Sequence, residues 1–226
     1  MKRRADLGAL REVLHERNVT SHPPPDSLYS HTTSFRFPEV VATSLAGEEV
    51  KMGTGEGRLF AGKWTLVGCA GSNFAQGMVD AWLTGVVEEA SADHASAGDA
   101  EGDGALSSPL LQTSWLSLVE GTILGWLRRP LLASMRRGVP TERHDRFLCR
   151  FDEDTSELRR CLQMSNRYLG YVCLVDPQGS VRWHVHGNEL PSADELSSLK
   201  KLLDGAMRFE QQQAQKQESR PDRRKR

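Results

Sequence analysis

Residues 168–187, YLGYVCLVDPQGSVRWHVHG, say most about the fold of this chain. The first half is an apolar, β-branched and aromatic run that ends in Asp-Pro-x-Gly, where proline fixes φ and glycine permits a positive φ. In the second half Val181, Trp183 and Val185 alternate with polar side chains, which is the period of a half-buried strand. The stretch therefore predicts a β-hairpin.

The segments around this hairpin predict the rest of the domain. A helix is expected over residues 192–203, where Ser192 and Glu195 form a capping-box pattern. Upstream, residues 64–70 form a continuous apolar run typical of a central strand, and a helical pattern follows Ser72. A βαβ unit followed by ββα resembles thioredoxin-like domains. We therefore expect an α/β fold with a thioredoxin-like mixed central sheet flanked by helices.

Other segments show weaker patterns. Residues 40–45, 48–52 and 115–119 are expected to be strands, and residues 123–137 and 156–169 are expected to be helices. In the helix over 123–137, Leu124, Leu127, Leu131 and Met135 lie opposite a face that bears arginines, and Pro130 kinks the helix or starts a new segment.

The composition suggests one domain with polar appendages. We expect an N-terminal helix and Pro-rich linker over residues 1–34 (a possible targeting region), a domain over 35–207 and a polar basic tail over 208–226. Residues 91–108 are expected to form a disordered acidic insert. No apolar run has the length of a transmembrane helix.

Charge is uneven along a chain of 226 residues whose net charge is −1. Residues 1–113 contain nine Lys/Arg and fifteen Asp/Glu, a net of −6, whereas residues 114–226 contain twenty and fifteen, a net of +5. The second half is therefore the expected contact for an anionic or acidic partner.

The cysteines argue against redox catalysis. None of the four is spaced as C-x-x-C, and Cys69 and Cys173 lie in apolar runs where a buried, reduced thiol is typical. Redox enzymes of this class place a nucleophilic cysteine at the N-terminus of the first helix, where this chain has GSNFA at 71–75. They also place a proline before the neighbouring strand, where Gly170 and Tyr171 stand. No catalytic residue is predicted, and a redox protein that uses Cys69 is kept as the alternative.

Metal and cofactor sites are also not expected. His184 and His186 share one strand face and could form a metal site with Asp176, but Trp183 and Val185 are better core residues, which leaves the histidines facing solvent. Glycines at 53, 55 and 57 lack the Lys-Ser/Thr end of a phosphate-binding loop.

The arginine-bearing helix is the most distinctive surface. Arg128, Arg129, Arg136 and Arg137 lie beside Trp126, with further arginines at 143 and 146. One interpretation is a solvated face with ordinary ion pairs. The other is a docking surface for an acidic helix, nucleic acid or an anionic lipid surface.

The chain resembles the mitochondrial ATP synthase assembly factors of the ATPase-subunit-ten type. The resemblance is strongest over residues 165–203, in Ser165-Asn166, the run from Gly170 to Asp176, Val181-Arg182-Trp183, Gly187 and Glu195 with Leu199. It continues weakly through Phe37-Pro38, Gly62-Lys63, Gln76 to Val79 with Trp82, and Val139-Pro140, and so covers about 35–205.

This resemblance implies a thioredoxin-like scaffold without a redox site. It implies a non-enzymatic chaperone, without cofactor, that is peripheral to the matrix side of the mitochondrial inner membrane and binds a membrane-sector ATP synthase subunit (subunit a, also called 6). Nucleic acid is not an expected partner, although a basic-tailed nucleic-acid adaptor is a further alternative. The predicted partner-binding residues are Trp126, Arg128, Arg129, Arg136, Arg137, Tyr171, Asp176, Arg182 and Trp183.

Overall fold

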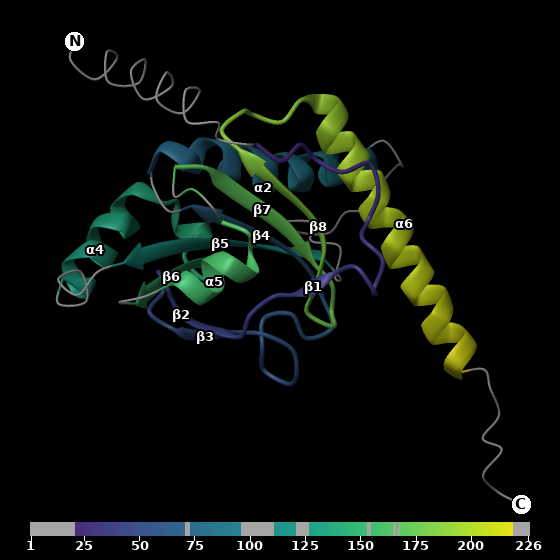
Figure 1. Ribbon diagram of the computed structural model, residues 1–226, viewed down its shortest axis with the longest axis horizontal. Helices are drawn as coiled ribbons and strands as arrows, with labels where there is room; N and C mark the ends of the chain where they lie inside the picture. The colour runs from purple at the N-terminus through teal and green to yellow at the C-terminus, as the bar shows by residue number, and fades with distance from the viewer. Residues whose placement is uncertain are drawn as a thin grey trace, which may run out of the picture.

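One mixed β-sheet organises the part of the chain that the computed structural model describes, which is residues 21–70, 73–95, 111–120, 127–152, 155–164, 166 and 168–218. Within these residues eight strands pair in the order β1-β8-β7-β4-β5-β6-β2-β3 (Figure 1). Their bounds are β1 Phe35–Arg36, β2 Val40–Ser44, β3 Glu49–Met52, β4 Trp64–Ala70, β5 Leu111–Glu120, β6 Phe147–Asp152, β7 Gly170–Val175 and β8 Ser180–Gly187.

The middle of the sheet has the predicted arrangement. β4 pairs with β5 in parallel and with β7 antiparallel, and β7 continues into β8 through the predicted hairpin. All seven residues of β4 are buried, as expected for a central strand. The βαβ unit followed by ββα, with strand order β5-β4-β7-β8, confirms the α/β, thioredoxin-like fold class.

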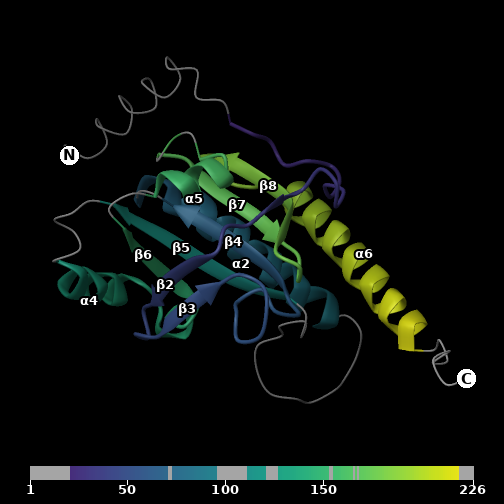
Figure 2. The same ribbon diagram turned by 60° about the horizontal axis from the view of Figure 1, so that its bottom comes forward.

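Helices cover both faces of the sheet (Figures 1 and 2). The helices are α2 Asn73–Ala95, α4 Arg128–Gly138, α5 Ser156–Cys161, α6 Ala193–Glu218 and the short 3-10 helix η1 Thr141–Arg143. One hydrophobic core lies between the sheet and helices α2, α4 and α6. The second core lies on the opposite face, beneath α5.

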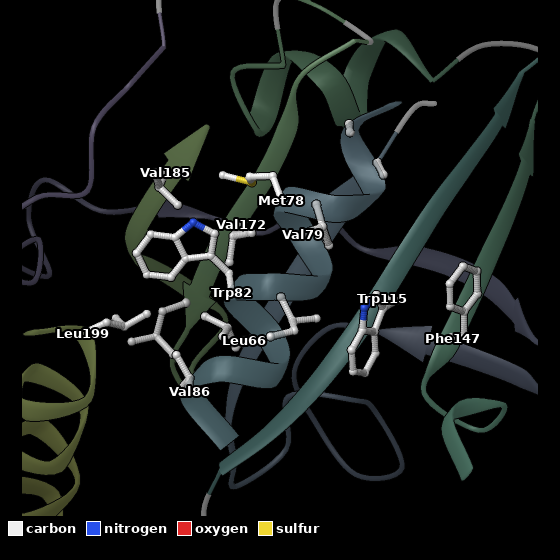
Figure 3. Close-up of a cluster of buried hydrophobic side chains, with 14 of the residues drawn as sticks. Leu66, Met78, Val79, Trp82, Val86, Trp115, Phe147, Val172, Val185 and Leu199 are labelled. Carbon is white, nitrogen blue, oxygen red and sulfur yellow. The ribbon is translucent and has the colours of Figure 1, made fainter. Parts of the chain in front are cut away.

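The first core is built around α2 (Figure 3). Trp82 of α2 packs edge-on against Trp183 of β8, with their ring centroids 5.2 Å apart. Two buried indole N–H groups have acceptors: Trp115 donates to Asp80 at 2.8 Å and Trp183 to the Pro25 carbonyl at 3.2 Å. These contacts bury large apolar area and pair the indole donors of Trp115 and Trp183.

A β-bulge changes the alternation predicted for β8. Leu174 pairs with Trp183 but Val175 pairs with Val181, so Arg182 is an extra residue on β8. Trp183 and Val185 therefore face the α2 core, whereas Val181 faces the opposite core. The prediction that Val181, Trp183 and Val185 share one face was wrong. The extra residue in the bulge places Val181, which precedes it, on the face of the sheet opposite to Trp183 and Val185.

The predicted helix over residues 156–169 is shorter than expected. Helix α5 ends at Cys161, and Gln163 adopts a φ of 55°. The amide of Met164 donates to the Arg159 carbonyl at 2.7 Å, and that of Gln163 donates to the Arg160 carbonyl at 3.1 Å. This is a Schellman motif, and Gln163 occupies the position of positive φ that is usually a glycine.

The boundaries around two other predicted segments also differ. Helix α4 begins at Arg128 with Pro130 in its first turn, a position where the missing proline N–H breaks no helical bond. Residues 123–126 of the predicted helix lie outside the described residues. Helix α2 extends to Ala95, so residues 91–95 of the predicted acidic insert are helical, and residues 96–108 lie outside the description.

The described part of the predicted Pro-rich linker packs on the domain. We call residues 21–34 the strap. His22 forms an isolated antiparallel bridge with His186, and the amide of Tyr29 donates to the Arg182 carbonyl at 2.6 Å. The strap therefore satisfies backbone groups along β8, although the sequence assigns it to the linker before residue 35.

Gly68 permits the close approach of α2 to β4. A Cβ at this position would lie 2.3 Å from Val79 Cγ1 and 2.9 Å from Leu83 Cδ1. We expect Gly68→Ala to lower the free energy of unfolding by about 1–3 kcal/mol, because α2 must shift away from the sheet. Urea denaturation should show this loss. Gly77→Ala is the control, since its Cβ would meet nothing within 4 Å. Equal stability of both variants would contradict the packing.

Among the helices of the described residues, none combines the length and the apolar character that crossing a membrane requires.

Candidate functional site

The junction between β4 and α2 is where a redox relative would place its nucleophile. Residues 71 and 72 lie outside the described residues, and α2 begins at Asn73. Cys69, the nearest thiol in the sequence, is an interior residue of β4 with 1% of its surface exposed. Burial raises its pKa to about 12, so the nucleophilic thiolate is scarce near neutral pH. Cys69 therefore has the environment of a structural thiol.

The other described thiols share this environment. Cys173 is buried on β7, and burial raises its pKa well above the ordinary value, with a smaller contribution from Cys69. Burial also raises the pKa of Cys149 to about 11, although Arg128 acts in the opposite direction. All three are free thiols, as predicted for Cys69 and Cys173.

Gly170 allows the start of α2 to lie against β7. A Cβ on Gly170 would lie 2.8 Å from Met78 Sδ and 3.1 Å from the Ala75 carbonyl oxygen. The first turns of α2 are thus pressed onto the strand at the position where a redox protein would have proline. No side chain fits between the helix and the strand at this point.

Asp176 and Arg182 hold the hairpin together. Asp176 is fully buried, and its Oδ1 accepts hydrogen bonds from the amides of Gln178 and Ser180 at 3.0 and 2.8 Å. Its Oδ2 accepts from Arg182 at 3.3 Å, and Arg182 Nε donates to the Tyr29 carbonyl at 2.7 Å. The carboxylate therefore closes the turn, while the arginine fastens the strap to the hairpin.

Most of the hairpin residues predicted to bind a partner are buried, which makes them inaccessible to one. Tyr171, Asp176 and Trp183 lie inside the protein. Tyr171 uses its hydroxyl within the fold, where it accepts from the Asn166 amide at 3.0 Å and donates to the Asn166 carbonyl at 3.1 Å. Of the four hairpin residues only Arg182 is partly exposed, and it is engaged by Asp176 and Tyr29. A partner could not touch the other three without disrupting the core.

Helix α4 places its arginines in two groups. Arg128 donates to the Thr43 hydroxyl and lies 5.2 Å above the Phe151 ring, while Arg136 donates to the Leu45 carbonyl. These two side chains fasten α4 to the end of the sheet. All four arginines are exposed, but among the described residues Arg129 and Arg137 have no ion-pair partner and do not hold the helix to the sheet. Trp126 lies outside the described residues.

Exposed apolar side chains lie at the start of α4 and on β2. Leu127, which directly precedes α4, is 49% exposed, and Val41 of β2 is 44% exposed. Arg143, predicted as part of the same basic group, instead lies 5.0 Å above the buried Trp115 ring, and Arg146 pairs with Asp145 at 3.7 Å. The part of the basic surface on α4 that does not hold the helix in place is thus narrower than the sequence suggests, and we define it as Arg129 and Arg137.

His184 of β8 does not face solvent, so the expectation was wrong for this residue, whereas His186 is half-buried. His184 is only 9% exposed, because the strap crosses its face of the sheet. The His22 ring stacks on His184 with centroids 4.4 Å apart, and the Tyr29 hydroxyl is hydrogen-bonded to His184 Nδ1 at 2.9 Å. Periodicity within β8 could not reveal this cover, since it comes from residues more than 150 positions away.

These rings do not form a metal site. The planes of His22, His184 and His186 lie within 23° of one another, so the three imidazoles stack and do not point their nitrogens to one centre. Across the described residues, no three His, Cys, Asp or Glu side chains are placed to hold a metal ion. Asp176, the third ligand considered from the sequence, is committed to the hairpin turn.

Solved structures with a similar arrangement include the following two, both of low sequence identity. BsSco, a member of the Sco family of cytochrome c oxidase assembly proteins, is 13% identical, with a TM-score of 0.46 over 75% of this chain and 94% of that one. A DsbF homologue from Corynebacterium diphtheriae is 10% identical, with a TM-score of 0.45 over 79% and 90%. The fold assignment itself rests on the sheet topology.

Sequence comparison identifies closer relatives. The proteins called mitochondrial ATPase complex subunit ATP10 from Eremothecium gossypii and Candida glabrata are 41% identical over 73 residues and 32% identical over 89 residues. The matches cover 32% and 39% of this chain and span only 27% and 32% of those relatives.

A family model covers far more of the chain. The model described as ATP10 protein matches residues 11–205, which includes the whole segment on which the resemblance was based. The expectation drawn from the hairpin and its flanking motifs is confirmed. This chain belongs to the ATP10 protein family.

Proposed function

We propose that this chain is a non-enzymatic assembly chaperone of the mitochondrial ATP synthase. The support is its membership of the ATP10 family together with relatives named as mitochondrial ATPase complex subunits. In this proposal the chain is mitochondrial, lies at the matrix side of the inner membrane and binds a membrane-sector subunit, subunit a (6), during its incorporation.

The exposed pair Arg129 and Arg137 is the observation that favours a binding function. The sequence of α4 contains four arginines and no acidic residue. Among the described residues neither Arg129 nor Arg137 has an ion-pair partner, whereas Arg128 and Arg136 are used to hold the helix. Leu127 and Val41 add exposed apolar surface. Such a surface suits a partner segment that carries carboxylates beside apolar side chains.

A redox role through Cys69 is less well supported. The thiol is buried within β4 and its pKa is raised to about 12. A nucleophilic cysteine needs a partly exposed, electropositive environment that favours the thiolate. The proposed function therefore requires no thiol chemistry, and a Cys69→Ala variant is expected to keep full assembly activity.

Charge reversal on α4 tests the proposed surface. We expect Arg129→Glu combined with Arg137→Glu to weaken co-purification of subunit a by at least about tenfold, which corresponds to 1.4 kcal/mol, because attraction becomes repulsion. The matched control is Lys201→Glu with Arg208→Glu, which changes net charge equally on exposed positions of α6, far from α4 in both views (Figures 1 and 2).

The same variants should be assayed in cells that lack the protein. We expect wild type, Cys69→Ala and the α6 control to restore proton-coupled ATP synthesis, and the α4 variant to leave ATPase activity uncoupled. Normal coupling without any copy of the protein would overturn the assembly role. Full rescue by the α4 variant would overturn only the proposed surface, and loss of rescue in Cys69→Ala with an intact fold would favour the redox alternative.

A further inference from the structure

The strap is held against β8 by a stack of aromatic and imidazole rings. His22 lies over His184 at 4.4 Å and 5.5 Å from His186, while His184 and His186 are 6.0 Å apart. Tyr29 of the strap contacts two of these rings, with its hydroxyl 2.9 Å from His184 Nδ1 and 3.5 Å from His22 Nε2. Two imidazoles from β8 and one from the strap thus share one partly buried cluster.

Backbone contacts fasten the strap on each side of this cluster. The His22 amide donates to the His186 carbonyl at 2.9 Å, and the His186 amide donates back to His22 at 3.2 Å. Further along, Tyr29 and Arg182 exchange hydrogen bonds through the Tyr29 amide and carbonyl. The Trp183 indole donates to the Pro25 carbonyl. These bonds and the ring stack hold residues 21–34 in place together with Leu28, which packs against the core, and His31, which Arg182 contacts.

The groups that face the cluster come from four elements. Arg182 supplies a positive charge nearby, and the Asp176 carboxylate is engaged by Arg182 at 3.3 Å and lies 3.9 Å from His31 Nδ1. Tyr171 lies 5.1 Å from the His186 ring, and a pocket beneath His184 is lined by Phe35, Leu162 and buried thiols. The titratable and charged groups around the three imidazoles are therefore Tyr29 and His31 of the strap, Arg182 of β8 with Asp176 at the turn, Tyr171 and Cys173 of β7, and Cys69 of β4.

We propose that His22, His184 and His186 form a pH-sensitive latch that releases the strap from β8 when the cluster takes up protons. A proton on the stacked His184 ring introduces a positive charge 4.4 Å from the His22 ring and 6.0 Å from the His186 ring, between ring centroids. Neutral rings stack without that repulsion. Acidification therefore favours the open strap, in which the imidazoles separate and become hydrated.

The direction of the effect follows from His184. Burial, then the neighbouring His22 and His186, lowers the pKa of His184 from 6.5 to about 4 in the closed arrangement. Above pH 6.5 the ring is neutral in both states and the strap stays closed. As the pH falls from 6.5 toward 4, the open state binds a proton that the closed state excludes. Opening should rise about tenfold between pH 7.5 and pH 5.5 from this residue alone.

Amide hydrogen exchange in the full-length protein tests the latch. We expect the His22, Tyr29 and His186 amides, after correction for intrinsic exchange rates, to lose protection about tenfold between pH 7.5 and 5.5. The amides of β4 in the same sample serve as the reference for global unfolding and should keep their protection. Unchanged protection of the strap, or equal loss in β4, would overturn the proposal.

Variants separate the latch from general acid sensitivity. His184→Gln removes the proton acceptor while keeping a side chain able to bond Tyr29, and His22→Gln removes the stacked partner. Either variant should flatten the pH dependence of strap opening. His144→Gln is the matched control, because His144 lies after η1 and bonds the Val139 carbonyl at 2.9 Å. The same tenfold rise in both latch variants would show that the cluster is not the sensor.

Discussion

Trp183→Ala is expected to lower the free energy of unfolding by about 3–5 kcal/mol, because the change leaves a large cavity between β8 and α2. Trp183 is fully buried, packs edge-on against Trp82 and donates its indole N–H to Pro25. Removal of the ring takes away core contacts and a strap contact together. Urea denaturation followed by circular dichroism measures the loss.

Two further variants make this result specific. Trp183→Phe keeps an aromatic ring but loses the N–H donor, and is expected to cost less than the alanine variant. Phe209→Ala removes an aromatic side chain that is 61% exposed on α6 and should change stability by no more than about 0.5 kcal/mol. A loss below about 1 kcal/mol for Trp183→Ala would contradict the central place of this residue in the core.

Asp176→Ala should destabilise the protein by about 3–5 kcal/mol, since it removes one partner of a buried ion pair. The side chain of Arg182 is 12% exposed and would lose the carboxylate that balances its charge. The amides of Gln178 and Ser180 would lose their acceptor as well. The measurement is again equilibrium unfolding, with the m-value checked for a change in the denatured state.

The two functions of this carboxylate can be distinguished. Asp176→Asn keeps an oxygen for the turn amides but removes the charge, so its stability should lie between wild type and the alanine variant. Asp145→Ala breaks an exposed ion pair with Arg146 at 3.7 Å and should cost about 0–1 kcal/mol. If Asp176→Ala proved as mild as Asp145→Ala, the buried ion pair would not be what holds the hairpin together.

Local patterns predicted the elements that depend on neighbours in the chain. The apolar run of β4, the turn at Pro177 and Gly179 and the Ser192–Glu195 capping box need only adjacent residues, and each is present. The end of α5 at Gln163 could not be predicted in the same way, because a glutamine at a φ of 55° carries no sequence signal.

The accessibility of the candidate site residues depends far more on contacts between residues that are distant in the sequence. The arginines of α4 look equivalent in sequence, yet Arg128 and Arg136 bond the end of β2 and the residue after it, while Arg129 and Arg137 have no ion-pair partner among the described residues. Which arginine is available to a partner follows from how the helix docks on the sheet. His22 and Tyr29 were missed entirely, since they lie in a stretch whose prolines indicate a linker.

The hairpin over residues 168–187 shows which features follow from the sequence and which require the tertiary structure. The sequence by itself determined two strands, the turn between them and the family, because these follow from side-chain alternation, proline and glycine geometry and a characteristic order of residues. Only the tertiary structure decided that the bulge at Arg182 turns Trp183 into one core and Val181 into the other, and that the strap buries His184. The register of a strand and the cover over its face depend on the free energy of packing between distant segments, which no local pattern records.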